Sequence, residues 1–444
     1  MKAVIFGSGG VALRLYMELT EKYGEDYIEF FIDSMLEKES FCDKPVYSLQ
    51  DLAKMDYNQY KYYFGTMSKQ LGMKKELLKI GVDPKNFCEE MDYSEDKFTQ
   101  TVKDFNSILI YPAPTDEIYE ILEQDFRYYF SEYYNKIRID YDMTRPITEY
   151  DLVLVWNKRH LNDGILLEHN KVFCIDETFY ITIRGRLMAK MYWILYTNDK
   201  GFSYRDKSKK IFKSIGNNAY ENGYIFASGP SLKDGLEKFL TMDRDNSLRV
   251  VCNSFISSKE YMNMIKPNAY FIMDSKFIGG FLRNITANIC EYIKENDCYL
   301  FVPEHWVPLL VNKFGIEDKI IGLEMDADDI HFPTNDNLKV YAKAANVITT
   351  TAIPVISRFV KQIYITGCDG QDENDMPVWT HTEDLFDLDT VKLEGARHII
   401  DLIDYIQRHN INYERVIKYG EGLGVKYESL TPSYIPCLME RYKG

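Results

Sequence analysis

The sequence has no closely spaced cysteines, no long apolar run and no excess of basic residues. Its eight cysteines are never closer than eight positions apart, which excludes the paired spacing of a zinc knuckle or a redox motif. No stretch approaches the roughly 18 apolar residues that a membrane-spanning helix needs. Lys and Arg number 53 against 68 Asp and Glu, for a net charge of −15. This balance argues against nucleic acid as a partner.

The composition nevertheless predicts a folded protein of several domains. The chain has 444 residues, and 45% of them are hydrophobic, including 35 Tyr and 25 Phe. This is enough apolar surface for a large core and excludes a mostly disordered chain. A glycine-rich turn follows after only a short strand, so we expect no secretory signal. We therefore expect reduced thiols and a cytoplasmic protein, with any contact to the inner membrane peripheral and made through partners.

Alternating strand and helix patterns predict an α/β fold with two Rossmann-like units. We expect an N-terminal Rossmann-like domain over 1–95, a middle α/β or connecting region over 96–215, and a larger doubly wound domain over 216–444. The predicted strands of the first two regions are Lys2–Phe6, Tyr27–Asp33, Tyr60–Phe64, Ser107–Tyr111 and Asp151–Trp156. Those of the third are Tyr224–Ala227, Arg249–Cys252, Ala269–Met273, Cys298–Val302 and Gln362–Thr366. Helices are predicted over Leu13–Tyr23, Leu232–Leu240, from near Thr351, and over Lys392–His409.

The N-terminal turn matches the Gly-x-Gly-x-x-Ala pattern of dinucleotide-binding loops. Gly7, Gly9 and Ala12 follow the first predicted strand, and Asp33 closes the second. The glycines would allow a pyrophosphate to approach the helix N-terminus, and Asp33 would accept hydrogen bonds from a ribose. A small Rossmann-like domain can also keep this turn for packing alone, so both interpretations stay open.

A second loop, Ser228-Gly229-Pro230-Ser231, connects a predicted strand directly to a helix. Its amides and hydroxyls would converge on the helix N-terminus, which is a natural site for an anion. Gly229 would let the backbone approach a phosphate, Pro230 would preset the turn, and Ser231 would cap the helix. An ordinary capped helix without a ligand is the alternative.

Polar residues also end three further predicted strands. Asn253 follows the strand ending at Cys252, Asp274 follows the strand ending at Met273, and Gly367 and Asp369 follow the strand ending at Thr366. Because ligands bind at the carboxyl ends of strands in open parallel sheets, these positions predict one binding site.

The ordered segments Ser-Gly-Pro-Ser-Leu, Cys-Asn-Ser-Phe, Ala-Tyr-Phe-Ile-Met-Asp and Gln-Ile-Tyr-Ile-Thr-Gly-Cys-Asp, between about 215 and 410, resemble the bacterial family 42 sialyltransferases. They also resemble the related motility accessory factor glycosyltransferases that modify flagellin. The resemblance implies a variant GT-A-like fold, a CMP-activated sialic-acid-like (nonulosonic) donor, no metal ion, and a glycan or protein hydroxyl as acceptor. It also implies contacts from Ser228, Gly229 and Ser231 to the nucleotide, from Asn253 to the donor, and from Gly367 and Asp369 to the nucleoside. The segments Phe30–Ser34 and Lys44–Ser48 resemble Rossmann-like domains fused to bacterial surface-sugar enzymes.

Two positions depart from the sialyltransferase pattern. Asp274 stands where those enzymes have Asn, and Thr349-Thr350-Thr351-Ala352 stands where they have Thr-Ser-Gly. We expect the threonines to offer amides and hydroxyls to a base or phosphate. The donor sugar is therefore left open.

Two of the seven histidines are candidates for the base that deprotonates the acceptor hydroxyl. The position of the sialyltransferase base favours His331, upstream of the Thr run. The accessory factors place a histidine after the late Gly-Asp loop, which favours His381, our first choice. His398, in the predicted terminal helix, is expected to be a surface or packing residue.

Acidic residues cluster around Asp326–Asp329 and Asp369–Asp375, but a clear Asp-x-Asp at a strand end is missing. We expect solvated surface there rather than a metal site, and no cofactor beyond the CMP-sugar donor. Two alternatives stay open. One is a nucleotide-dependent pyrophosphokinase, whose family has a similar Gly-Pro-Ser-Leu loop. The other is a sugar-nucleotide-binding subunit of polysaccharide assembly without activity.

Overall fold

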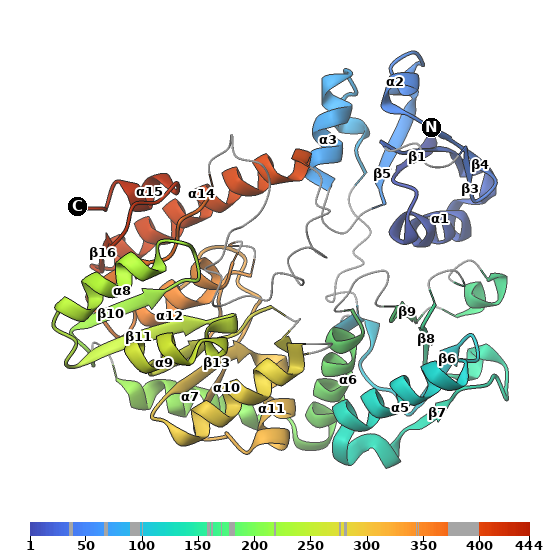
Figure 1. Ribbon diagram of the computed structural model, residues 1–444. Helices are drawn as coiled ribbons and strands as arrows, with labels where there is room; N and C mark the ends of the chain where they lie inside the picture. Colours follow the sequence, from blue (N-terminus) through green and yellow to red (C-terminus); the bar gives the residue numbers. More distant parts are fainter. Residues whose placement is uncertain are drawn as a thin grey trace. The chain divides into compact units, whose positions relative to one another are not determined.

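The computed structural model contains three separate β-sheets with mostly parallel strands (Figure 1). It is therefore an α/β protein, as predicted. Contacts divide the chain into two units, Met1–Leu195 and Tyr196–Gly444. The residues described are 1–34, 39–65, 70–88, 98–99, 101–157, 160, 163–169, 171–176, 183–216, 219–274, 277–278, 282–342, 344, 346–371 and 399–444.

The first sheet has the strand order β3-β4-β2-β1-β5, and every pair except β3 with β4 is parallel. Alternate residues of β1 are buried on opposite faces: Val4 and Phe6 in one cluster, Ala3 and Ile5 in another. The predicted strands and helix in this region are confirmed. The elements are β1 (Lys2–Phe6), α1 (Gly10–Tyr23), β2 (Ile28–Ile32), β3 (Ser40–Phe41), β4 (Lys44–Tyr47), α2 (Leu49–Leu52), β5 (Tyr60–Phe64) and α3 (Gln70–Lys79).

A second, four-stranded sheet follows in the order β7-β6-β8-β9, with all pairs parallel. The two strands predicted here, β6 and β8, are confirmed; all of β8 is apolar and buried, and β6 is apolar and buried at its three central residues. The elements are β6 (Ser107–Tyr111), α5 (Asp116–Phe130), β7 (Arg138–Asp140), β8 (Leu152–Val155), β9 (Val172–Cys174) and α6 (Ile183–Lys200).

The second unit contains a seven-stranded sheet in which every neighbouring pair is parallel. The strand order is β14-β13-β12-β11-β10-β15-β16. All five predicted strands are present within two residues. Two strands were not predicted: β14, which is short and apolar, and β16, a short edge strand with polar residues at alternate positions. The strands are β10 (Asn222–Phe226), β11 (Ser247–Cys252), β12 (Ala269–Phe271), β13 (Tyr299–Pro303), β14 (Ile320–Leu323), β15 (Gln362–Thr366) and β16 (Lys426–Ser429).

Helices cover both faces of this sheet because its strands are apolar on both sides. On one face, Phe239 of α8 packs against Tyr224 and Phe226 of β10. The other face forms a large core with α7, the π-helical turn η12, α12 and α14. The helical elements are α7 (Ser203–Ile215), α8 (Leu232–Thr241), α9 (Lys259–Ile265), α10 (Arg283–Glu295), α11 (Val307–Phe314), η12 (Ile348–Ala352), α12 (Ile353–Ile356), α14 (Ile399–Gly422) and α15 (Pro436–Met439).

Helix α7, which precedes the predicted boundary at 216, packs on β14: the Gly322 amide donates to Ser208 Oγ at 3.0 Å. The terminal helix continues past His409 to Gly422, and the part of its predicted span before Ile399 lies outside the described residues. Among the described helices, none combines the length and apolarity needed to cross a bilayer.

Candidate functional site

The seven-stranded sheet changes winding direction between β10 and β15. From β10 the chain adds β11 to β14 on one side, and it then returns to place β15 on the other side. In open α/β sheets the crevice at such a switch point, outside the carboxyl ends of the strands, is where ligands bind. The loops that follow β10 and β15 are the predicted segments 228–231 and 367–369, so the topology brings them together.

These two loops contact each other directly. The Gly229 amide donates to the Gly367 carbonyl at 2.9 Å, and the Ser231 amide donates to Asp369 Oδ2 at 3.1 Å. The Ser231 hydroxyl donates to Thr431 Oγ1 at 2.9 Å and makes no cap hydrogen bond, so the predicted cap by Ser231 is wrong. Instead the Asp369 carboxylate lies at the N-terminus of α8, where the helix dipole favours a negative charge. The Gly229 and Ser231 amides therefore already have acceptors within the protein.

The glycines of these loops are required by the loop contact itself. A Cβ at Gly229 would lie 2.1 Å from Asp369 Oδ2, and one at Gly367 would lie 2.1 Å from the Ala227 carbonyl oxygen. Gly367 also has a φ of +70°, in the left-handed region. The sequence analysis assigned Gly229 to the approach of a phosphate, but the partner that comes close is the β15 loop.

Asn253 provides an unsatisfied acceptor at the carboxyl end of β11, the strand next to β10. Its φ is +53°, and its carbonyl accepts a hydrogen bond from the Tyr270 hydroxyl at 2.5 Å. Its side-chain Oδ1 is buried and has no hydrogen-bond partner in the described part of the chain. An unpaired buried acceptor costs about 1–3 kcal/mol, so a ligand donor would stabilise this site. Asp274 is exposed beyond β12.

The Thr run lies in the buried turn η12, and most of its polar groups are used internally. Asn346 Oδ1 accepts the amides of Ile348 and Thr349 at 2.8 and 3.0 Å. The hydroxyl of Thr349 donates to the Ala344 carbonyl, and that of Thr351 to the Val347 carbonyl at 2.6 Å. The Thr349 amide and the Thr349 and Thr351 hydroxyls therefore donate within the protein rather than to a ligand. Thr350, 4% exposed, makes no side-chain hydrogen bond within the described residues and is the member that could serve one.

A buried polar chain links η12 to the β15 loop. The Nδ2 group of Asn346 donates to His409 Nε2, and the His409 ring lies 4.8 Å from that of Tyr413. The Tyr413 hydroxyl donates to Cys368 Sγ at 3.5 Å. The sequence analysis did not identify these residues, because nothing in their local pattern distinguishes them from ordinary helix positions.

Because of this burial, stability should depend on pH through His409. Burial lowers the pKa of His409 to about 4, below its ordinary value near 6.5. Between these values the unfolded chain binds a proton that the folded protein does not, so stability falls as pH decreases. We expect a loss of about 2 kcal/mol between pH 7 and pH 5, measured by urea unfolding. His409→Gln, which keeps an acceptor for Asn346 but does not titrate, should lose that part of the dependence. An equal dependence in both proteins would contradict the assignment.

Of the two candidate bases, His381 lies outside the described residues. His331 lies between β14 and η12, and its Nε2 is buried without a hydrogen-bond partner among the described residues. The acidic residues near it form ion pairs, Asp326 with Lys339 at 3.0 Å and Asp329 with Arg415 of α14. No group of three metal-binding side chains occurs in the described part of the chain. The second acidic cluster lies mostly beyond Gln371, outside the described residues.

The N-terminal glycine motif lies at the switch point between β1 and β5. Gly7 has a φ of +118°. Ala12 packs closely against Gly65: a Cβ added at Gly65 would lie 2.4 Å from the Ala12 Cβ. The Ser8 hydroxyl donates to Asp33 Oδ2. Gly9 differs, because a Cβ there would meet nothing within 4 Å. The fold thus requires small or flexible residues at Gly7 and Ala12, whereas it does not require a glycine at position 9.

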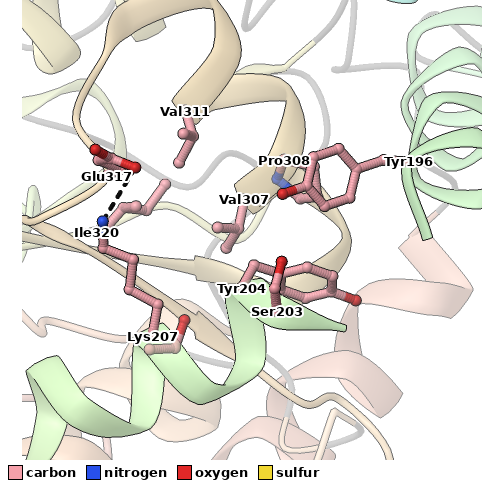
Figure 2. Close-up of a pocket in the computed structure, with 10 residues that line it drawn as sticks. Tyr196, Ser203, Tyr204, Lys207, Val307, Pro308, Val311, Glu317 and Ile320 are labelled. Carbon is pink, nitrogen blue, oxygen red and sulfur yellow. Dashed lines mark ion pairs between the residues drawn. The ribbon is translucent and has the colours of Figure 1, made fainter. Parts of the chain in front are cut away.

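A cavity of about 160 Å³ occurs elsewhere in the second unit, between α7, α11 and β14. Figure 2 shows Tyr196, Tyr204 and Pro308 around it, with Lys207 paired to Glu317 at 3.0 Å. It contains none of the predicted site residues, so it is not part of the β10–β15 site.

No family model, curated protein or solved structure matches this chain. The chain's own geometry brings Ser228–Ser231, Gly367 and Asp369 together at the carboxyl ends of β10 and β15, with Asn253 at the neighbouring strand end. The motif around Gly7 lies in the other unit.

Proposed function

We propose that the crevice between β10 and β15 binds a CMP-activated nonulosonic sugar, and that the second unit is a GT-A-like glycosyltransferase. The acceptor would be a hydroxyl of a surface glycan or protein. The observation that carries this proposal is the buried, unpaired Oδ1 of Asn253 at the carboxyl edge of β11. An acceptor in that position suits a ligand rich in hydroxyl and amine donors, such as an activated sugar.

The contact between the loops suggests a changed set of roles for the predicted residues. The Ser231 amide holds Asp369 Oδ2 at 3.1 Å, which would leave the carboxylate oriented to accept hydrogen bonds from ribose hydroxyls. The Ser228 and Thr350 hydroxyls would serve the phosphate, while Asn253 and Asp274 would position the sugar. A donor with one phosphate needs no divalent cation to neutralise a diphosphate, which is consistent with the proposed absence of a metal.

In the proposed reaction, His381 or His331 accepts the proton of the acceptor hydroxyl. The acceptor oxygen then bonds to the anomeric carbon, the bond from that carbon to the phosphate oxygen breaks, and CMP leaves with the electron pair. Hydrogen-bond donors around the phosphate would stabilise the charge that develops on it.

One observation favours a second candidate, a subunit that binds the sugar nucleotide without transfer. The Gly229 and Ser231 amides already have acceptors within the protein, at 2.9 and 3.1 Å, so few backbone donors in this loop can stabilise a leaving group. The two candidates differ in turnover: release of CMP from the donor, with or without an acceptor, identifies the enzyme.

Asn253→Ala should weaken binding of CMP or of the CMP-sugar five- to tenfold, because it removes about 1 kcal/mol of hydrogen bonding. The measurement is isothermal titration calorimetry on the full chain. Asn246→Ala is a matched control, since Asn246 has a φ of +50° but precedes β11 at the opposite edge of the sheet. Equal affinity in all three proteins would contradict the role of Asn253.

A further inference from the structure

The four-stranded sheet of the first unit has a switch point of its own. From β6 the chain adds β7 on one side and then places β8 on the other. The loops that follow β6 and β8 are joined, because Trp156 Nε1 donates to the Pro112 carbonyl at 2.6 Å. A crevice at the carboxyl ends of β6 and β8 is therefore a second place where this fold favours a ligand.

A Tyr–Asp–His cluster lies at this edge. The hydroxyl of Tyr111, the last residue of β6, donates to Asp163 Oδ2 at 2.5 Å, and His160 Nδ1 lies 3.0 Å from the same oxygen. Burial, and then this carboxylate, raises the pKa of Tyr111 to about 12, so the tyrosine stays a donor. Since an ionised carboxylate only accepts hydrogen bonds, Nδ1 of His160 must carry the proton. In the neutral ring, the lone pair is then on Nε2.

The neighbouring His169 shows what a purely structural histidine looks like in this sheet. It is buried, its Nε2 donates to the Tyr150 carbonyl at 2.8 Å, and its Nδ1 accepts the Lys171 amide at 3.1 Å. Both nitrogens are thus satisfied by the backbone. In His160 the side chain is 40% exposed, and Nε2 makes no hydrogen bond to any described residue.

We propose that this Tyr111–Asp163–His160 cluster is a second ligand site, in which His160 Nε2 accepts a hydrogen bond from a sugar hydroxyl. The pattern of a carboxylate that orients an imidazole, whose other nitrogen faces outward, is the one that proteins use to accept protons from hydroxyls. The negative charge of Asp163 disfavours a phosphate at the same position. The hydroxyl can belong to a free sugar or to the ribose of a nucleotide. The site lies in the other unit from the proposed transferase crevice and does not depend on it.

The test uses the full chain with ¹⁵N-labelled histidine and records the ring nitrogens by NMR, assigned with His160→Gln and His169→Gln. We expect the Nδ1–H form for His160 and the opposite Nε2–H form for His169. Probes are N-acetylneuraminic acid, N-acetylglucosamine, CMP and inorganic phosphate. A sugar-bearing probe should shift Nε2 of His160 but not the nitrogens of His169. A response to the free sugars or to CMP alone identifies the source of the hydroxyl.

Asp163→Asn should remove this response or weaken the probe's affinity about tenfold. Tyr111→Phe, which keeps the Asp163–His160 pair, should retain the Nδ1–H form of His160. This control shows whether the effect of Asp163→Asn comes from the lost carboxylate or from a general loss of structure. Three results would overturn the proposal. They are an Nε2–H form of His160, a shift of Nε2 with inorganic phosphate that equals the shift with the sugar-bearing probes, and no shift with any probe.

Discussion

Replacing Gly367 by alanine is expected to destabilise the second unit by about 2 to 4 kcal/mol. The new Cβ would lie 2.1 Å from the Ala227 carbonyl oxygen. Neither residue can move away easily, because each directly follows one of two paired parallel strands, β10 and β15. Overpacking of this kind costs about 1–3 kcal/mol, and the left-handed φ of +70° adds about 1 kcal/mol for a residue with a side chain. The effect would be measured from the shift of the urea unfolding transition assigned to this unit.

Gly424→Ala separates the two causes. Gly424 has a φ of +87°, but a Cβ there would meet nothing within 4 Å. We expect this control to lose only the roughly 1 kcal/mol of backbone strain. If both variants lost the same stability, the close approach of the β10 and β15 loops would not be a main contributor to it.

Replacing His381 by alanine is expected to lower kcat of sugar transfer by about 10² to 10⁴, the range for loss of a general base. Affinity for the donor should change little, because the proposed base would contact the acceptor hydroxyl and not the donor. His331→Ala is the matched comparison. His331 Nε2 is buried and has no hydrogen-bond partner among the described residues. If kcat fell in the His331 variant and not in the His381 variant, His331 would be the base. Donor turnover unchanged in both variants would contradict a histidine base. No donor turnover in the unsubstituted chain would favour binding without transfer.

The strands were predictable because their residues are apolar over short runs bounded by polar or glycine residues. Strand β10 reads Asn-Gly-Tyr-Ile-Phe, and all but its first residue are buried. The four-residue strand β14 was nevertheless missed, although it is apolar and buried. Strand β7, with only three residues, and β16, with exposed and half-buried polar positions, lack such a run and were also missed. Their place in the sheets depends on neighbouring strands rather than on their own sequence.

The location of the candidate site in the sheet was predictable from the sequence, but the hydrogen bonds between its residues were not. Four strand ends carried polar residues, and the parallel order brings all four, those of β12, β11, β10 and β15, side by side. However, Ser231 and Asp369 are separated by 138 positions, so no local pattern could show that the carboxylate meets the amide. The same holds for Asn346 and His409, 63 positions apart, whose contact helps to fix the Thr run in a π-helical turn.

The most direct test of the central claim is a thermal-shift comparison of the full chain with CMP, CDP, UDP, GDP, ATP and NAD, each with and without Mg²⁺. A ligand that binds the native state raises the unfolding midpoint, and the rise grows with the logarithm of its concentration relative to Kd. We expect CMP to raise it without Mg²⁺, and Asn253→Ala to reduce that rise. Stabilisation by ATP that depends on Mg²⁺, with none by CMP, would contradict a CMP-sugar site at the β10–β15 crevice.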